Sequence, residues 1–312
     1  MLSLLRRLKL SYSLYNVFQR RKLAHNLPLY QRLGLNKRYF SPISSRDFAH
    51  LSPTAGLPPV PPLAERLASC AAFQALPAAS KASLLAFEDN GFAVLSGFFG
   101  TEAVDTINQE LANLIATRQI DLRYRNKFMF AFRQSASIRQ AGEGPLRTLI
   151  AALLGHETTL FQSINFLTGS EQRTHSDSIH MSTFPLGGMA AAWVALEDIT
   201  PNNGPLHYYP GSHKLPYYLN ADYANEGSTW LNGDKEYTEY EATIARKIAE
   251  AGIEKQIFLA QKGDVFIWHA NLMHGGEPHY DKAQTRKSMV FHYFSRAHIC
   301  YHEITQRPAL LG

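Results

Sequence analysis

A histidine and an aspartate lie two residues apart in the segment THSD, residues 174–177, directly after the strand-like run TLFQSINFLT. Side chains two apart in an extended segment point to the same face, so His175 and Asp177 can offer neighbouring ligand atoms to one metal ion. An imidazole and a carboxylate suit a metal ion of hard or borderline character. The pair alone is weak evidence, because His279 and Asp281 repeat its spacing with no matching segment downstream.

The third ligand is expected in the segment GDVFIWHANLMHGG, residues 263–276, which holds His269 and His274. We favour His274 because it precedes a glycine pair, whereas His269 closes an apolar run and can face either the pocket or the core. A second imidazole completes a set of two histidines and one carboxylate on one face of an octahedron. That set leaves coordination positions open, which is the arrangement of non-haem iron(II) oxygenases.

Arg286 opens the strand-like run RKSMVFHYF twelve residues after His274. A buried guanidinium beside a metal ion can hold a carboxylate through two parallel hydrogen bonds. Ser288 lies two residues further on, so it points to the same face and can add a third bond. The order of these segments along the chain is more specific than any one of them.

The elements that position these residues change in kind near residue 158. Helices are predicted first, over residues 78–90, 101–119 and 144–155, and Thr101 is expected to cap the second of them. Short β-type runs follow, at residues 159–168, 189–199, 256–261, 264–270 and 288–294. A helix over residues 236–252 interrupts them. This order predicts a mostly β double sheet or barrel with flanking N-terminal helices and one helical insertion.

Positive charge is concentrated at the N-terminus of this 312-residue chain, whose net charge is +5. Residues 1–46 hold ten of the 31 Lys and Arg side chains and no Asp or Glu. The other 21 bases face 26 acids, which gives the rest of the chain a net charge of −5. A basic arm over residues 1–52 therefore precedes a mildly acidic body, and the charge of the body gives no reason to expect nucleic acid as a partner.

The arm has two apolar stripes at helical spacing. The first comprises Leu5, Leu8, Tyr12 and Tyr15, and the second comprises Leu14 and Phe18. Three interpretations stay open: the arm packs on the body, lies on an anionic membrane surface, or directs the chain to an organelle. A proline-rich connector, residues 53–62, separates it from a compact domain over residues 63–312.

Composition excludes several classes of protein. No run of 18 or more apolar residues is present, so a membrane-spanning helix is not expected. The chain has only two cysteines, Cys70 and Cys300, which rules out a disulfide scaffold and favours a reducing, cytoplasmic environment. The sequence gives no indication of the oligomeric state.

In order along residues 85–295, the chain resembles the phytanoyl-CoA dioxygenase family of Fe(II)/2-oxoglutarate-dependent oxygenases. Residues 87–111 resemble the opening strand and helix of the family, and THSD resembles its HQD ligand motif. Residues 191–214, AAWVALEDITPNNGPLHYYPGSHK, resemble its signature loop. Residues 263–276 and 285–294 resemble the distal ligand and the 2-oxoglutarate clamp.

The resemblance implies a double-stranded β-helix, of the jelly-roll and cupin-like kind. It implies Fe(II) bound by His175, Asp177 and His274, and the 2-oxoglutarate carboxylate held by Arg286 and Ser288. It also places Gln162 and Trp193 in the pocket for the co-substrate. Dioxygen is implied as the second co-substrate, with ascorbate as a candidate reductant.

The implied reaction is hydroxylation of an unactivated C–H bond, with release of succinate and carbon dioxide. Desaturation and cyclisation are alternatives, whereas Asp177 argues against a halogenase, which replaces the carboxylate by a small residue. The substrate is expected to be a small molecule, free or linked to a lipid or glycan. A different hypothesis is a non-catalytic β-barrel binding module, which the loss of a metal ligand or of Arg286 would favour.

Several other side chains carry expectations about the pocket. The residues just after the ligand motif are predicted to touch substrate, and they are His180, Met181 and Phe184. His292 is expected in the core or beside the ligands, and Lys127 is expected in solvent. Trp230 and Tyr237 are candidates for a lid.

Overall fold

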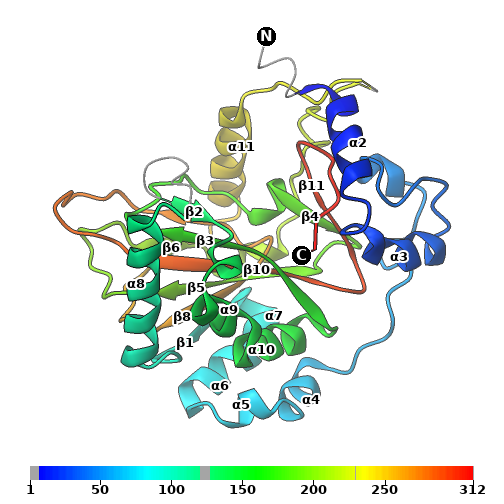
Figure 1. Ribbon diagram of the computed structural model, residues 1–312. Coiled ribbons are helices and arrows are strands. Elements are labelled where there is room, and N and C mark those ends of the chain that lie inside the picture. Colours follow the sequence, from blue (N-terminus) through cyan, green and yellow to red (C-terminus); the bar gives the residue numbers. More distant parts are fainter. Residues whose placement is uncertain (1–6, 120–126, 229, 312) are drawn as a thin grey trace.

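A computed structural model describes residues 7–119, 127–228 and 230–311 of the chain (Figure 1). The strands are β1 (Phe92–Leu95), β2 (Lys127–Met129), β3 (Thr158–Phe166), β4 (Met181–Phe184), β5 (Met189–Ala195), β6 (Leu206–Tyr208), β7 (Gln256–Phe258), β8 (Val265–His269), β9 (His274–Gly276), β10 (Ser288–Ser295) and β11 (Ile299–His302). The α-helices are α2 (Lys9–Phe18), α3 (Leu27–Arg32), α4 (Leu63–Ala68), α5 (Ala71–Gln74), α6 (Ala78–Leu85), α7 (Phe87–Asn90), α8 (Thr101–Ala116), α9 (Ala136–Glu143), α10 (Pro145–Leu154) and α11 (Tyr237–Glu250).

The strands form one large antiparallel sheet and two small ones. The large sheet has the order β1-β8-β5-β10-β3-β2, and the small sheets pair β11 with β4 and join β7, β6 and β9. Apart from the pairs β2–β3 and β6–β7, neighbours in the sheets are not consecutive in the sequence, which is the pattern of a jelly roll rather than of a meander. The predicted double-stranded β-helix with flanking helices is confirmed.

The two faces of the large sheet have different neighbours. On β10, Met289, Phe291 and Tyr293 point into a cluster with the helices α4 to α10, which lie along one side of the sheet in Figure 1. Residues of the opposite parity, such as Val290, share a second cluster with Trp193, Trp268 and Leu206 of β6. Because side chains alternate along a strand, one face of the sheet anchors the helices and the other faces the small sheet and the site.

The helices begin and end close to the predicted residues. The helix predicted over 78–90 is broken at Ala86 into α6 and α7, and Gly91 ends it with φ 77°. Only glycine adopts this left-handed conformation without steric cost. The prediction that Thr101 caps α8 is wrong by one residue, because Gly100 is the N-cap and Thr101 is already helical.

The arm packs on the body through its second half. Leu29, Tyr30, Leu33, Ile43 and Phe48 form one buried cluster with the β11 residues Ile299 and Tyr301. The Phe48 ring stacks on that of Phe184, with 4.1 Å between centroids. Leu5, the first member of the predicted stripe, lies outside the described residues. None of the helices that the structure describes is both long and apolar enough to cross a bilayer.

Helix α11 confirms the predicted insertion and lies over the segment that carries the HxD motif. Its buried face, Tyr240, Ile244 and Ile248, packs with Ile179 and Met273. The Tyr240 hydroxyl accepts a hydrogen bond from the Ser176 backbone N–H over 3.1 Å. The insertion therefore braces the residue between His175 and Asp177.

Candidate metal centre

The two candidate histidine ligands are held side by side by their own backbones. His175 and His274 exchange both hydrogen bonds of an antiparallel bridge, each with an N···O distance of 2.9 Å. His274 starts β9, which pairs with β6, and His175 precedes the turn of 3-10 helix Asp177–Ile179. The backbone thus fixes His175 and His274 as neighbours, although they are 99 positions apart in the sequence, and no bound ligand is needed for this.

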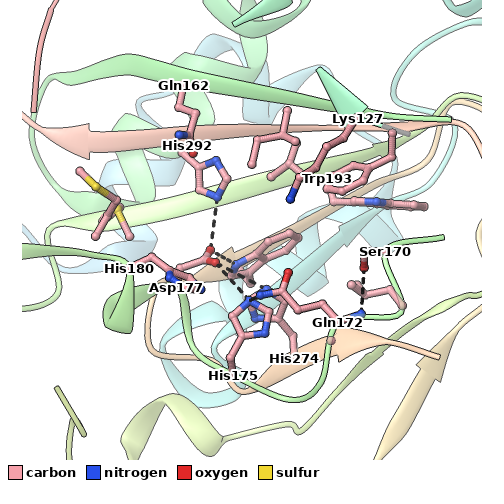
Figure 2. Close-up of a pocket in the computed structure, with 18 of the residues that line it drawn as sticks. Lys127, Gln162, Ser170, Gln172, His175, Asp177, His180, Trp193, His274 and His292 are labelled. Carbon is pink, nitrogen blue, oxygen red and sulfur yellow. Dashed lines mark hydrogen bonds and ion pairs between the residues drawn. The ribbon is translucent and has the colours of Figure 1, made fainter. Parts of the chain in front are cut away.

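Both imidazoles turn the same nitrogen toward the centre. The Nδ1 atoms of His175 and His274 lie 2.8 Å and 3.0 Å from the backbone oxygens of Arg173 and Leu272. Such a contact requires Nδ1 to carry the proton, which leaves the Nε2 lone pair of each ring for a metal ion. Figure 2 shows these rings converging with Asp177 on one point.

His175, Asp177 and His274 make up a buried group whose ligand atoms all lie within 4.8 Å of one another. The Asp177 Oδ1 atom is 3.9 Å from Nε2 of His175 and 3.7 Å from Nε2 of His274. Two nitrogens and one carboxylate oxygen at these separations fit a divalent transition-metal ion with open positions. The donor set fits iron.

The second oxygen of Asp177 is held by two further side chains. Its Oδ2 atom accepts a hydrogen bond of 2.7 Å from the Trp268 indole N–H, and it lies 3.5 Å from Nε2 of His292. These contacts orient the carboxylate and leave Oδ1 directed to the centre.

The protonation states of the three candidate ligands favour the binding of a cation. Burial alone would raise the pKa of Asp177, but His274 and His292 hold that pKa well below its usual value. Burial, together with the neighbouring His274, lowers the pKa of His175 to about 4. At neutral pH the group therefore consists of one carboxylate and neutral imidazoles, the protonation state in which they bind metal.

Arg286 lines the same cavity, and only 2% of this residue is exposed to solvent. Its Nε donates to the Gly204 carbonyl over 3.0 Å and its Nη1 donates to the Ser288 hydroxyl over 2.7 Å. The guanidinium carbon lies 4.9 Å from the centroid of the Trp193 ring. Among the described residues no carboxylate is within ion-pair distance of Arg286.

A buried guanidinium without an anionic partner is costly unless a ligand supplies one. The Trp193 indole N–H next to it is also buried, and no described residue accepts a hydrogen bond from it. Arg286 and Trp193 thus present unused donors on one side of the cavity, and Ser288 supports Arg286 from behind. The residues present fit the far carboxylate of 2-oxoglutarate.

The cavity has a volume of about 580 Å³, which is enough for a small molecule beside the centre. Gln162, His180 and Met181, predicted from sequence, all line it. So does Lys127 on β2, contrary to the expectation that it lies in solvent. The cause is register: Lys127 pairs with Phe166 of β3, so its side chain follows the edge of the large sheet into the cavity.

The model of the family described as "Phytanoyl-CoA dioxygenase (PhyH)" matches residues 87–288. This range includes every candidate ligand and Arg286. The chain belongs to the phytanoyl-CoA dioxygenase family. The predicted class of enzyme, an Fe(II)/2-oxoglutarate-dependent dioxygenase, is confirmed with it.

The relatives that match this chain have low sequence identity to it and carry different enzyme names. The chain is 28% identical over 210 residues to "Ectoine dioxygenase" of Sphingopyxis alaskensis, covering 61% of this chain and 68% of that protein. It is 22% identical over 190 residues to "Phytanoyl-CoA dioxygenase domain-containing protein 1" of Mus musculus, covering 43% of this chain and 65% of the mouse protein. The chain thus spans less than two thirds of the mouse relative.

Solved structures agree with the fold. EctD from S. alaskensis in its apoform superposes with a TM-score of 0.52 at 22% identity, covering 71% of this chain and 78% of that one. The non-haem α-ketoglutarate-dependent epimerase SnoN superposes with a TM-score of 0.55 at 19% identity, covering 73% and 87%. EctD has also been solved with bound iron and with 2-oxoglutarate and 5-hydroxyectoine.

For the site of this family member, one sequence-based expectation needs correction and one open alternative is resolved. Phe184 does not line the cavity, because it faces the arm and stacks on Phe48. His269 is not near the ligands: it has the opposite parity to Trp268 on β8, so it points to the other side of the sheet, near His213. His213 itself stabilises its loop, with Nε2 3.1 Å from the Glu88 carbonyl.

Three residues around the candidate ligands were not expected from the sequence. Trp268 and Tyr240 hold the ligand segment, and Gln172 places its side-chain nitrogen 3.1 Å from Nε2 of His175. Trp268 could have been found from strand parity, since it alternates with Ile267 on β8. Tyr240 and Gln172 have no such signal, because a helical insertion and a loop bring them into place.

Proposed function

We propose that this chain hydroxylates an unactivated C–H bond of a small molecule, using Fe(II), 2-oxoglutarate and dioxygen. One observation carries the proposal: the His175–Asp177–His274 group and the anion-seeking Arg286 open into the same buried cavity. The alternative of a non-catalytic binding module predicts the loss of a ligand or of the clamp. All four side chains are present.

Each residue has a task that follows from its contacts. His175, Asp177 and His274 would hold the metal, while Arg286 and Ser288 would hold the far carboxylate of 2-oxoglutarate by charge-assisted hydrogen bonds. Bound iron, with 2-oxoglutarate and dioxygen as co-substrates, would supply the oxidising power for breaking a C–H bond, with succinate and carbon dioxide as the by-products. Trp193 and the strands around it exclude water from the clamp.

The positions of His180 and Met181 support their proposed role in substrate contact. Both line the cavity, and the His180 ring stacks on Tyr237 of α11 with 5.5 Å between centroids. Tyr237 places its hydroxyl 3.3 Å from Nε2 of His180. Helix α11 would therefore set the position of a substrate-facing imidazole.

The charges of the cavity support a neutral or anionic substrate. Among the described lining residues Asp177 is the only carboxylate, and it belongs to the metal group. Lys127 and Arg286 are the cationic side chains in this lining. With Asp177 engaged by a metal ion, no described carboxylate remains for an ammonium group of a substrate.

The names of the relatives support a small-molecule substrate without selecting one. They include an ectoine dioxygenase and a phytanoyl-CoA dioxygenase, and a solved neighbour is an epimerase. The screen should therefore be broad: metabolites are incubated with protein, Fe(II) and 2-oxoglutarate, and succinate is measured. The proposal predicts a compound that raises succinate formation and gains one oxygen atom from labelled dioxygen. Substrate-dependent succinate with a product lacking that atom would refute hydroxylation.

A further inference from the structure

Helix α2 presents its apolar side to solvent and a polar side to the body. Leu10, Leu14, Val17 and Phe18 follow helical spacing, and they are exposed to 60%, 55%, 43% and 83%. Asn16, between them in the sequence, is 1% exposed. A surface helix normally buries its apolar stripe, so this arrangement is inverted. We name these four side chains the α2 stripe.

Contacts on the other side of α2 fix this orientation. The guanidinium of Arg307 lies 5.7 Å from the ring centroid of Tyr12 and 5.2 Å from that of Tyr15. At its start, the backbone N–H of Lys9 donates to the Trp230 carbonyl over 2.9 Å, and Arg7 forms an ion pair of 2.8 Å with Asp234. The α2 stripe therefore stays outside unless these contacts break. Figure 1 shows α2 at the periphery of the molecule.

Exposed cations and an aromatic side chain flank the α2 stripe. Arg20, Arg21 and Lys22 lie just after Gln19, the C-cap of the helix, and are exposed, and the first 46 residues contain no acid. Trp230, bonded through its backbone to the start of α2, is 71% exposed. Leucine and phenylalanine next to basic residues, with a tryptophan at the edge, are the composition of helices that lie in a membrane interface.

We propose that the α2 stripe docks on an anionic lipid bilayer. The charges favour this partner over a second copy of the chain. Two copies meeting at this face would bring Arg20 and Arg21 close to their own like charges, whereas anionic headgroups neutralise them. The rest of the chain has a net charge of −5 and is repelled by the same surface, so contact through the arm sets the orientation.

The side of α2 that contacts Arg307 is linked to the cavity of the metal centre. His302 lines that cavity, and its backbone N–H donates to the carbonyl of Arg307 over 2.8 Å. Arg307 in turn contacts Tyr12 and Tyr15 of the helix. A docked α2 would therefore place one wall of the cavity close to the lipid surface. The docking itself depends on α2 alone and holds whatever the reaction is.

The test is sedimentation of the full chain with phosphatidylcholine vesicles, with and without phosphatidylserine, at low and high salt. We expect sedimentation only with phosphatidylserine and its loss at high salt. The double variant Leu14→Glu/Phe18→Glu should lower vesicle binding about tenfold or more, because it replaces inserted apolar groups by charges. Leu259→Glu changes a leucine of similar exposure (51%) outside the arm, directly after β7, and should bind as wild type. Arg20→Glu/Arg21→Glu leaves the α2 stripe intact and should also reduce binding.

Failure to sediment with phosphatidylserine vesicles, by wild-type protein shown to be folded by circular dichroism, would overturn the proposal. So would equal binding of wild type and the Leu14→Glu/Phe18→Glu variant. A wild type that is dimeric in solution, becomes monomeric in that variant and does not bind vesicles would assign the α2 stripe to self-association instead. None of these results depends on the oxygenase reaction.

Discussion

The indole N–H of Trp268 donates a hydrogen bond of 2.7 Å to the carboxylate of Asp177. This contact links the C-terminal end of β8, in the large sheet, to the turn that carries a candidate metal ligand 91 residues earlier. The same carboxylate keeps its other oxygen for the centre. A core tryptophan thus sets the orientation of a candidate ligand that would otherwise rotate about its own side-chain bonds.

Trp268→Phe is expected to weaken Fe(II) binding about 10- to 100-fold, because the orienting donor is lost while the ring volume is largely kept. Equilibrium dialysis of Fe(II) under anaerobic conditions measures the effect. Trp230→Phe, at an exposed position, is the control and should bind Fe(II) as wild type. Equal Fe(II) affinity of wild type and Trp268→Phe would show that this hydrogen bond has no orienting role.

Arg286→Ala is expected to weaken 2-oxoglutarate binding by about 2–5 kcal/mol, since one partner of a buried charge pair is removed. Arg286→Lys keeps the charge but not the two-pronged geometry, so its affinity should lie between those of wild type and the alanine variant. Calorimetry with Fe(II)-loaded protein measures this. The matched surface variant Arg296→Ala should bind 2-oxoglutarate as tightly as wild type. An unchanged affinity for 2-oxoglutarate in Arg286→Ala would mean that the co-substrate binds elsewhere.

Tyr240→Phe is expected to lower the free energy of unfolding by about 1–3 kcal/mol, because the Ser176 backbone N–H is buried and loses its acceptor. Since Ser176 lies between two ligands, the same variant should also bind Fe(II) less tightly. Urea unfolding and metal titration measure the two effects. Tyr280→Phe, on an exposed ring, is the control. A Tyr240→Phe protein with wild-type stability would mean that another group satisfies this N–H.

Lowering the pH is expected to reduce the free energy of unfolding, because the fold buries histidines in their neutral form. Burial, with a smaller contribution from His156, lowers the pKa of His298 from 6.5 to about 3. Below pH about 6.5 the unfolded chain binds a proton that the folded chain refuses, so stability present at neutral pH is lost as pH falls toward the folded pKa. The loss should amount to a few kcal/mol at most for this group.

Urea unfolding at neutral pH and at pH about 5 tests this expectation. The free energy of unfolding should be lower at the acidic pH, and the difference should be smaller in His298→Gln. Equal stability at the two values of pH would contradict the burial of neutral imidazoles.

Much of this architecture is predictable because it depends on alternation and short-range spacing. His175, Asp177, His274 and Arg286 each lie beside a run whose period indicates a strand, and the strands β3, β5, β8 and β10 follow the predicted runs. The family resemblance then orders those runs in space. Parity along β8 also explains why His274 rather than His269 reaches the cavity.

The rest depends on contacts that local sequence does not encode. Phe184 follows the ligand motif closely, yet it turns to the arm because Phe48 provides a stacking partner. From the local sequence Lys127 is expected in solvent, and only the pairing of β2 with β3 brings it to the cavity. The outward orientation of Leu14 and Phe18 is set by the contact of Arg307 with the tyrosines of α2, and periodicity alone cannot tell which of two stripes is buried.

The central claim is that one cavity binds Fe(II) through the histidine–aspartate group and 2-oxoglutarate through the arginine. Anaerobic equilibrium dialysis of 2-oxoglutarate, with and without Fe(II), tests it most directly. Wild-type protein should retain 2-oxoglutarate tightly only when Fe(II) is present, and Asp177→Asn should lose this dependence while Asp281→Asn, in the second HxD pair, keeps it. Folded wild-type protein that shows no Fe(II)-dependent binding of 2-oxoglutarate would contradict the claim.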